Sequence, residues 1–188
     1  MSNSFFHTVA AESLDSMNTT ARFTEADTAV LAQYQNELLA LAQPICQAFY
    51  DGLFANPKTR AVFKDGERPA REQTLIDWWK RTVQGPINED YWAWQAYVGL
   101  IHVKRGVTNT MMLAQTCVML EVVRNHHPDK VELHNSLSRL LTNVSAVIAH
   151  AYDRFFSKSL EAVTGMSMEL IHNQVAIGVD DVLTQYKR

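Results

Sequence analysis

The chain has 188 residues, of which 47% are hydrophobic and 20% charged, and its formal net charge is −3. This length and composition suit one globular domain and exclude a disordered chain. Only 7 glycines and 5 prolines occur, which argues against an all-β fold because tight turns depend on these residues. No basic stripe for nucleic acid, no apolar span for a membrane and no Lys or Arg before Arg22 is present. We therefore expect a cytoplasmic protein that binds neither nucleic acid nor membrane.

Helical periodicity runs through the chain, and no segment shows the alternation of a β-strand. Residues 1–22 are rich in Ser, Thr and Asn and are expected to form an N-terminal arm or a short helix. The main domain is expected over 23–164, and 165–188 adds a C-terminal helix. Proline, glycine and capping residues divide the chain into helices near 24–41, 44–55, 70–84, 88–104, 108–127, 129–162 and 167–185. The sequence therefore predicts an all-α protein.

One histidine, His102, differs from the other six because it shares a helix face with large apolar residues. It continues a series of three- and four-residue spacings through Tyr91, Trp94 and Val98. In one interpretation His102 is a core histidine whose ring nitrogens are hydrogen-bonded. In the other it is the axial ligand of a haem iron, which requires a neutral imidazole in an apolar wall.

The metal interpretation of His102 favours haem over zinc. A zinc site would need about three or four ligands, and no second His or Cys stands three or four residues after His102. The chain also lacks a Cys-x-x-Cys-His motif, so a haem would be haem b, held without covalent attachment.

Tyr50 and Thr74 are candidates for the opposite side of such a pocket. The Tyr50 hydroxyl could donate to bound O2, or it could simply reach water from a half-buried ring. Thr74 could add a second polar group, or it could bond its own helical turn. Lys104 and Arg105 could pair with haem propionates, or they could only complement a helix C-terminus. Spacing alone leaves these alternatives open.

Other chemistries have little support in the sequence. Cys46 and Cys117 are far apart and are expected to be two buried thiols. No glycine-rich phosphate loop and no G-x-S-x-G motif occurs. Acidic pairs such as Glu89-Asp90 suit a helix end better than an acid/base dyad.

From Phe23 to about Ser167 the chain resembles the sensor-globin group, which comprises the globin domains of globin-coupled sensors and the related protoglobins. The segment that carries most of the resemblance is Asp90-Tyr91-Trp92 followed by Val98-Gly99-Leu100-Ile101-His102-Val103-Lys104-Arg105-Gly106-Val107. The resemblance implies a globin-like fold with an extra N-terminal segment and an extra C-terminal helix, and it implies that His102 is the proximal haem ligand. Arg105 departs from the family pattern, in which Ile is usual at this position.

Two further segments resemble the distal side of the family's haem pocket. Ala48-Phe49-Tyr50-Asp51 is similar to the segment whose Tyr is the distal hydrogen-bond donor, and Gln73-Thr74-Leu75 is similar to a segment that faces the ligand. The resemblance thus implies roles for Tyr50 and Thr74. We expect the remaining haem contacts to come from Phe49, Phe63, Leu75, Trp78, Val98, Val107 and Met112.

The resemblance implies a haem-b globin that binds O2, CO or NO reversibly and acts as a gas sensor rather than an enzyme. The family's output modules are not expected in this chain. A homodimer is expected through 108–127 and 129–162, where Val131, Leu141, Tyr152 and Phe156 lie beyond a single apolar stripe. Two alternatives stay open: a haem enzyme with NO-dioxygenase or peroxidase-like activity, and a haem-free globin-like interaction module.

Overall fold

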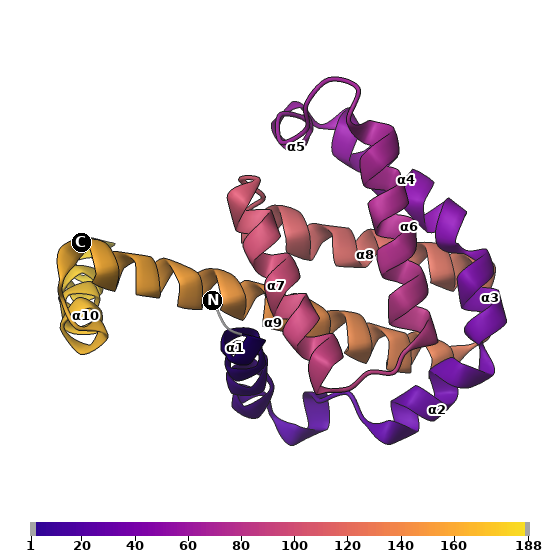
Figure 1. The fold of residues 1–188 in the computed structure, drawn as a ribbon, viewed down its shortest axis with the longest axis horizontal. Helices are drawn as coiled ribbons and strands as arrows, with labels where there is room; N and C mark the ends of the chain where they lie inside the picture. The colour runs from indigo at the N-terminus through magenta and orange to yellow at the C-terminus, as the bar shows by residue number, and fades with distance from the viewer. Residues whose placement is uncertain (1–2, 187–188) are drawn as a thin grey trace. The chain divides into compact units, whose positions relative to one another are not determined.

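A computed structural model describes residues 3–186, and within this range the chain forms helices and no strand (Figure 1). The prediction of an all-α fold is confirmed. In chain order the elements are α1 (Asn3–Ser16), η1 (Thr19–Ala21), α2 (Glu25–Gln33), α3 (Gln35–Ala40), α4 (Ala42–Ala55), α5 (Pro57–Arg60), α6 (Arg68–Gln84), α7 (Glu89–Lys104), α8 (Asn109–His126), α9 (Val131–Thr164) and α10 (Met168–Tyr186).

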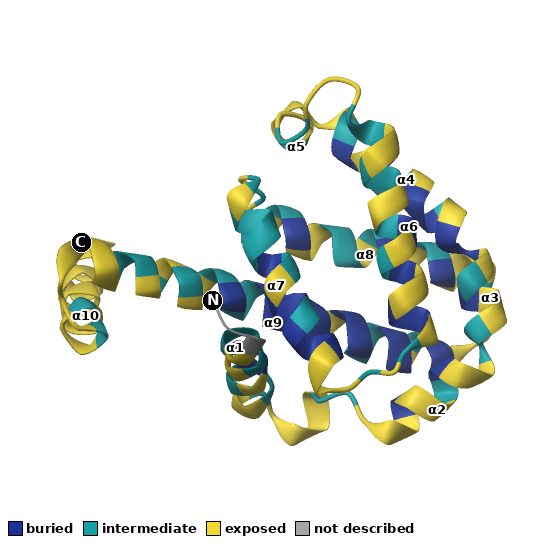
Figure 2. Ribbon diagram, viewed as in Figure 1, coloured by how far each residue is buried: buried dark blue, intermediate teal, exposed yellow. Residues whose placement is uncertain are grey.

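The residues form two compact units, whose boundary falls within α9 between Tyr152 and Asp153. The first unit holds the hydrophobic core, and its buried residues lie on the inward faces of its helices (Figure 2). The second unit consists of the last part of α9 and α10, and α10 has no buried residue. None of the helices in the described range is long and apolar enough to cross a membrane.

Most helices begin where the sequence predicts, because a side chain caps the first turn. The Thr24 hydroxyl accepts from the Asp27 backbone N–H while the Asp27 carboxylate accepts from the Thr24 N–H, which is a complete capping box. Asn88 caps α7 and Thr108 caps α8. The single helix predicted over 24–41 is instead two helices, because the backbone at Tyr34 leaves the helical region.

The long helix α9 forms one wall of the first unit's core. Its buried residues recur at three- and four-residue spacings, as the sequence predicts: Leu133, Leu137, Leu140, Val144, Val147, Ile148 and Ala151. Helix α7 lies against α9 without a side chain between their backbones at Gly99. A Cβ atom added to Gly99 would stand 2.9 Å from the Ile148 carbonyl oxygen and 3.0 Å from the Ala151 Cβ. This close approach fixes α7, which carries His102, on the core.

The N-terminal helix α1 packs along α7. Val9 and Ala10 are buried, and the Phe6 ring meets the Tyr97 ring edge-to-face at a centroid distance of 5.5 Å. The His7 imidazole lies 2.9 Å from the Asp90 carboxylate at the start of α7. Helix α1 is therefore part of the first unit.

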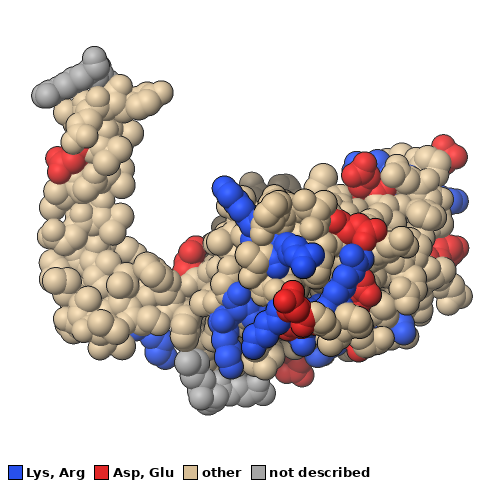
Figure 3. Space-filling view, turned by 90° about the horizontal axis from the view of Figure 1, so that it is seen from above, with Lys and Arg blue, Asp and Glu red and all other residues tan. Residues whose placement is uncertain are grey.

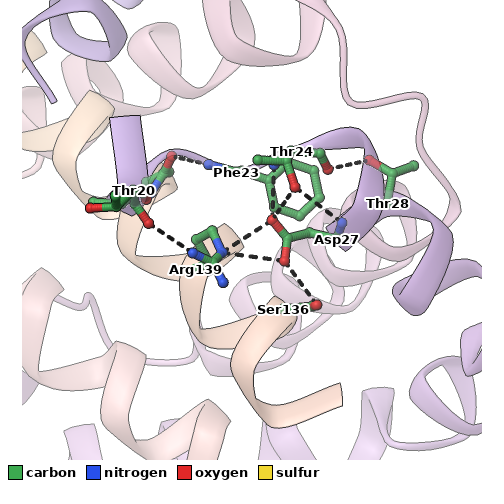
Figure 4. A network of polar contacts seen from close by, with 9 residues as sticks. Thr20, Phe23, Thr24, Asp27, Thr28, Ser136 and Arg139 are labelled. Carbon is green, nitrogen blue, oxygen red and sulfur yellow. Dashed lines mark hydrogen bonds and ion pairs between the residues drawn. The ribbon is translucent and has the colours of Figure 1, made fainter. Parts of the chain in front are cut away.

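A polar network joins the start of α2 to α9 (Figure 4). The buried Asp27 carboxylate accepts hydrogen bonds from the Ser136 hydroxyl at 2.9 Å and from the Arg139 Nε at 3.2 Å. Arg139 also donates to the Thr20 carbonyl oxygen at 2.9 Å. Burial raises the pKa of Asp27, but the hydrogen bonds from Thr24 and Ser136 and the Arg139 charge outweigh it, so the pKa lies below its usual value.

Two sequence-based expectations about burial are wrong. Cys46 is buried as predicted, but Cys117 is exposed because it lies on the face of α8 opposite the buried Met112 and Met119. Leu141 is only 1% exposed and belongs to the core, so it offers no surface for a partner.

Candidate functional site

A cavity of about 580 Å³ lies in the first unit, with walls from α4, α6, α7, α8 and α9. This volume is in the range of cofactor and small-molecule sites. Its lining includes the exposed residues Thr74 and Arg81 of α6 and Tyr97 of α7, so the cavity reaches the surface between these two helices. Most of the deeper lining is apolar, with aromatic, aliphatic and methionine side chains.

His102 stands in the last turn of α7 and lines this cavity. The helix end follows from Gly106, whose φ of +75° is accessible to glycine at little cost. The Gly106 N–H donates to the Val103 carbonyl and the Val107 N–H to the His102 carbonyl, which is a Schellman motif. The sequence Lys104-Arg105-Gly106-Val107 therefore ends the helix directly after His102 and returns Val107 to the cavity wall.

The surroundings of the His102 imidazole suit a metal ligand. Its Nδ1 atom is buried and has no hydrogen-bond partner among the described residues. Burial, and then the nearby Arg105 charge, lower the pKa of His102 to about 4, so the ring is neutral near pH 7 and keeps a lone pair. His102 is therefore not a core histidine whose two ring nitrogens are both hydrogen-bonded within the described residues.

A single imidazole ligand in a largely apolar cavity fits a haem. No group of three or more His, Cys, Asp or Glu residues within the described range could hold a metal ion, whereas one imidazole suffices for haem iron. The cavity's aromatic and aliphatic walls suit a flat macrocycle, and its opening between α6 and α7 gives charged groups access to solvent. The residues present therefore fit the group.

Tyr50 faces His102's cavity from α4. Its ring is packed among the rings of Phe49, Phe54 and Phe63, and only 6% of the residue is exposed. The hydroxyl donates to the Arg71 backbone carbonyl of α6 at 2.9 Å. Burial raises the pKa of Tyr50, so the hydroxyl keeps its proton and remains a donor.

The α6 residues that line the cavity include the predicted Thr74, Leu75 and Trp78, and also Arg71, Asp77 and Arg81. Thr74 is exposed, and its hydroxyl donates to the Ala70 carbonyl of the same helix at 2.9 Å. The Trp78 indole N–H donates to the Gln95 side-chain oxygen of α7 at 3.1 Å, which ties the two helices that flank the opening.

Charged residues gather around one end of the cavity (Figure 3 shows Lys and Arg side chains over α5 and the end of α7). Arg105 lines the cavity and donates to the Glu67 carboxylate at 2.8 Å. Lys104 is exposed and is not part of the lining. At the other end, the Arg81 guanidinium lies 3.8 Å from the centroid of the Trp94 ring.

The structure brings together the predicted site residues Phe49, Tyr50, Phe63, Thr74, Leu75, Trp78, Val98, His102, Arg105, Val107 and Met112, all of which line the one cavity. Apart from Met112 of α8, sequence reasoning missed the wall formed by α8 and α9, where Met119, Leu141, Val144 and Ile148 contribute. The apolar stripe of α9 was visible in the sequence, but no signal there tells that part of it faces His102.

A comparison with known protein families matches residues 10–155 to the family described as Protoglobin. This range contains every residue that lines the cavity. A search among curated proteins finds no match.

Proposed function

Since the chain belongs to the protoglobin family, and is thereby a globin-type haem-binding and gas-binding protein, we propose that His102 is its axial haem ligand and Tyr50 its distal hydrogen-bond donor. The observation that carries the proposal is the His102 imidazole, which lines the cavity with a buried and unpaired Nδ1. A buried polar atom without a hydrogen-bond partner destabilises the folded state by about 1–3 kcal/mol.

Haem, when bound, would supply an iron atom that can bind a diatomic gas such as O2, CO or NO. His102 would hold the iron from α7, and its imidazole is neutral near pH 7 because its pKa is lowered to about 4. The rings of Phe49 and Phe63 and the side chain of Leu75 exclude water from the opposite side. The Tyr50 hydroxyl is a buried polar group on that side and would donate toward a bound gas when it leaves the Arg71 carbonyl.

The cofactor is proposed to be haem b, since the chain has no Cys-x-x-Cys-His motif for covalent attachment. Arg105 is the better placed of the two predicted partners for a haem carboxylate, because it lines the cavity and Lys104 does not. Arginine also offers two donors side by side, so Arg105 can bind a carboxylate while it keeps one bond to Glu67.

A sensor role and a homodimer belong to the same proposal. The haem-binding domain is proposed to span 23–164, with 165–188 leading toward an output partner. Val131 of α9 and Phe156 of α9 are 63% and 65% exposed, and Leu113 of α8 is 49% exposed, which supports an interface on these helices. Tyr152 is only partly buried on the same helix.

An absorption spectrum of the purified chain, reconstituted with haem and reduced with and without CO, tests the function. We expect a Soret band that shifts on CO addition, and we expect His102→Gly to lose it and regain it with added imidazole. His126→Ala is the matched control, because His126 is exposed at the end of α8 and should leave the spectrum unchanged. A colourless reconstituted chain contradicts the proposal and supports a haem-free module. A His102→Gly variant with the wild-type spectrum contradicts the assignment of His102 as the haem ligand.

A further inference from the structure

Glu67, at the start of α6, joins three segments at one end of the cavity without lining it. One carboxylate oxygen accepts from Arg105 at 2.8 Å and from the Lys64 backbone N–H at 3.1 Å. The other oxygen lies 3.3 Å from the Arg71 Nε, one turn along the same helix. The Glu67 side chain is 16% exposed. The hydrogen bond from Arg105, and then the one from the Lys64 backbone, lower the pKa of Glu67 to about 2. This carboxylate therefore stays ionised and paired at physiological pH.

Arg71 connects this cluster to the distal side of the cavity. Its guanidinium pairs with Glu67, and its backbone carbonyl accepts the hydrogen bond of the Tyr50 hydroxyl at 2.9 Å. The Phe63 ring provides a second contact, since it lies 5.9 Å from the Tyr50 ring and 6.0 Å from the Arg105 guanidinium. A continuous chain of contacts thus leads from the turn after His102 to Tyr50.

We propose that Glu67 is a positioning residue for Tyr50. Its ion pairs with Arg105 and Arg71, here called the Glu67 clasp, hold the first turns of α6 in place. The Arg71 carbonyl therefore keeps its hydrogen bond from the Tyr50 hydroxyl and competes with a gas ligand for that donor. The inference rests on the proposed function of Tyr50 as the distal donor. It assigns the clasp a role in setting the affinity for gases that accept hydrogen bonds.

Competition follows from the chemistry of the hydroxyl. Tyr50 has one proton to donate, so a full hydrogen bond to the Arg71 carbonyl and one to a gas ligand exclude each other. The Arg71 carbonyl competes well only while α6 is held at this distance from α4. When the clasp is broken, the carbonyl becomes a poorer partner and Tyr50 donates more strongly into the cavity. This hydrogen bond stabilises bound O2, whereas bound CO is a weak acceptor and is stabilised little.

The test uses the full-length haem-loaded chain and the variant Glu67→Gln, which keeps the size of the side chain and removes its charge. Stopped-flow displacement should show that O2 dissociates about two- to tenfold more slowly, which corresponds to the net free energy of one hydrogen bond. The rate of CO dissociation should be nearly unchanged. In a Tyr50→Phe background Glu67→Gln should have no effect on O2. Glu72→Gln is the matched control, because Glu72 pairs with Arg68 in the same part of α6 and has no bond to Arg71 or Arg105.

A second measurement uses the haem-free chain. Chemical denaturation of wild type, Glu67→Gln, Tyr50→Phe and the double variant forms a double-mutant cycle. Tyr50→Phe should lower the folded-to-unfolded ratio about three- to tenfold with the clasp intact, and clearly less in the Glu67→Gln background. This coupling should be absent when Glu72→Gln replaces Glu67→Gln.

The outcomes separate the inference from the function on which it rests. An O2 rate that is unchanged in Glu67→Gln, or changed equally with Phe at position 50, overturns the role of Glu67 and leaves haem binding intact. An additive double-mutant cycle overturns it as well. A wild-type chain that never binds haem contradicts the proposed function instead, while the haem-free cycle still reports on the clasp.

Discussion

At the scale of single residues, His102 and Gly99 show that one helix both lines the cavity and packs tightly on a neighbouring helix. Both lie on α7, three positions apart, and they face different surroundings. His102 lines the cavity, whereas Gly99 faces the backbone of α9, where a Cβ would stand 2.9 Å from the Ile148 carbonyl oxygen. The imidazole is therefore carried by a helix that packs tightly on α9 one turn before His102.

Gly99→Ala tests this packing. A backbone carbonyl cannot give way like a flexible side chain, so the added methyl should push α7 from α9 and lower the free energy of unfolding by about 1–3 kcal/mol. Urea denaturation followed by circular dichroism measures the change.

Gly52→Ala is the control for Gly99→Ala. Gly52 lies within α4 and is exposed, and a Cβ atom added to it would meet no neighbouring element within 4 Å. This substitution should raise the free energy of unfolding by about 0.5–1 kcal/mol, because alanine favours the helix. Equal effects of the two substitutions would mean that α7 and α9 are not in tight contact.

At the scale of elements, the polar network of Asp27 decides how the start of α2 is held on α9. Its carboxylate serves the capping box of α2 and also accepts from Ser136 and Arg139 of α9 (Figure 4). Asn143, one turn further along α9, donates to the Ala21 carbonyl and accepts from the Phe23 N–H, each at 2.9 Å. The segment before α2 is thus held by hydrogen bonds between its backbone and side chains of α9, in addition to the packing of Phe23 against the core.

Asp27→Asn should lower the free energy of unfolding by about 1.5–3 kcal/mol at pH 7, because charge-assisted hydrogen bonds are lost and Arg139 keeps only its bond to the Thr20 carbonyl. Asp15→Asn is the control, since Asp15 is 79% exposed and pairs with Arg22 at 3.5 Å; it should change stability by less than about 0.5 kcal/mol.

The pH dependence of the same comparison gives a second check. The folded-state pKa of Asp27 is lowered from 3.8, so its stabilising contribution is complete above that pH and is lost as the pH falls through the folded-state value. The difference between wild type and Asp27→Asn should therefore shrink below about pH 4. A difference that grows toward low pH would contradict the assignment.

At the scale of the whole molecule, the apolar surface is concentrated at the C-terminal end of the chain. Phe156 and Val163 of α9 are 65% and 85% exposed, and α10 exposes Val175, Val182 and Tyr186 among others. Exposed apolar surfaces of this kind are typical of interaction sites. The proposed homodimer uses α8 and α9, so its test must distinguish these helices from α10.

Analytical ultracentrifugation of wild type, Phe156→Glu and Val175→Glu makes that distinction. We expect a dimer for wild type and for Val175→Glu, and a shift to monomer for Phe156→Glu, because a carboxylate buried in an apolar interface has no partner. A monomeric wild type, or a dimer that only Val175→Glu disrupts, would contradict an interface on α9.

The amino-acid sequence by itself determined most of the helices and the candidate residue at the centre of the site. Spacings of three and four residues, capping residues and Gly106 act locally, so the boundaries of α6, α7 and α8 and the place of His102 in the last turn of α7 follow from near neighbours in the chain. The motif around His102 and Tyr50 likewise lies in short segments and indicates the family.

Tertiary structure alone decided which distant side chains meet. The cavity wall from Leu141 to Ile148, the bond of Tyr50 to the Arg71 carbonyl and the pair of Glu67 with Arg105 join segments that are separated by tens of residues. The exposure of Cys117 and the burial of Leu141 depend on the rotation of α8 and α9 toward their neighbours. Local spacing gives each helix its faces, but only packing among the helices selects which partner each face receives.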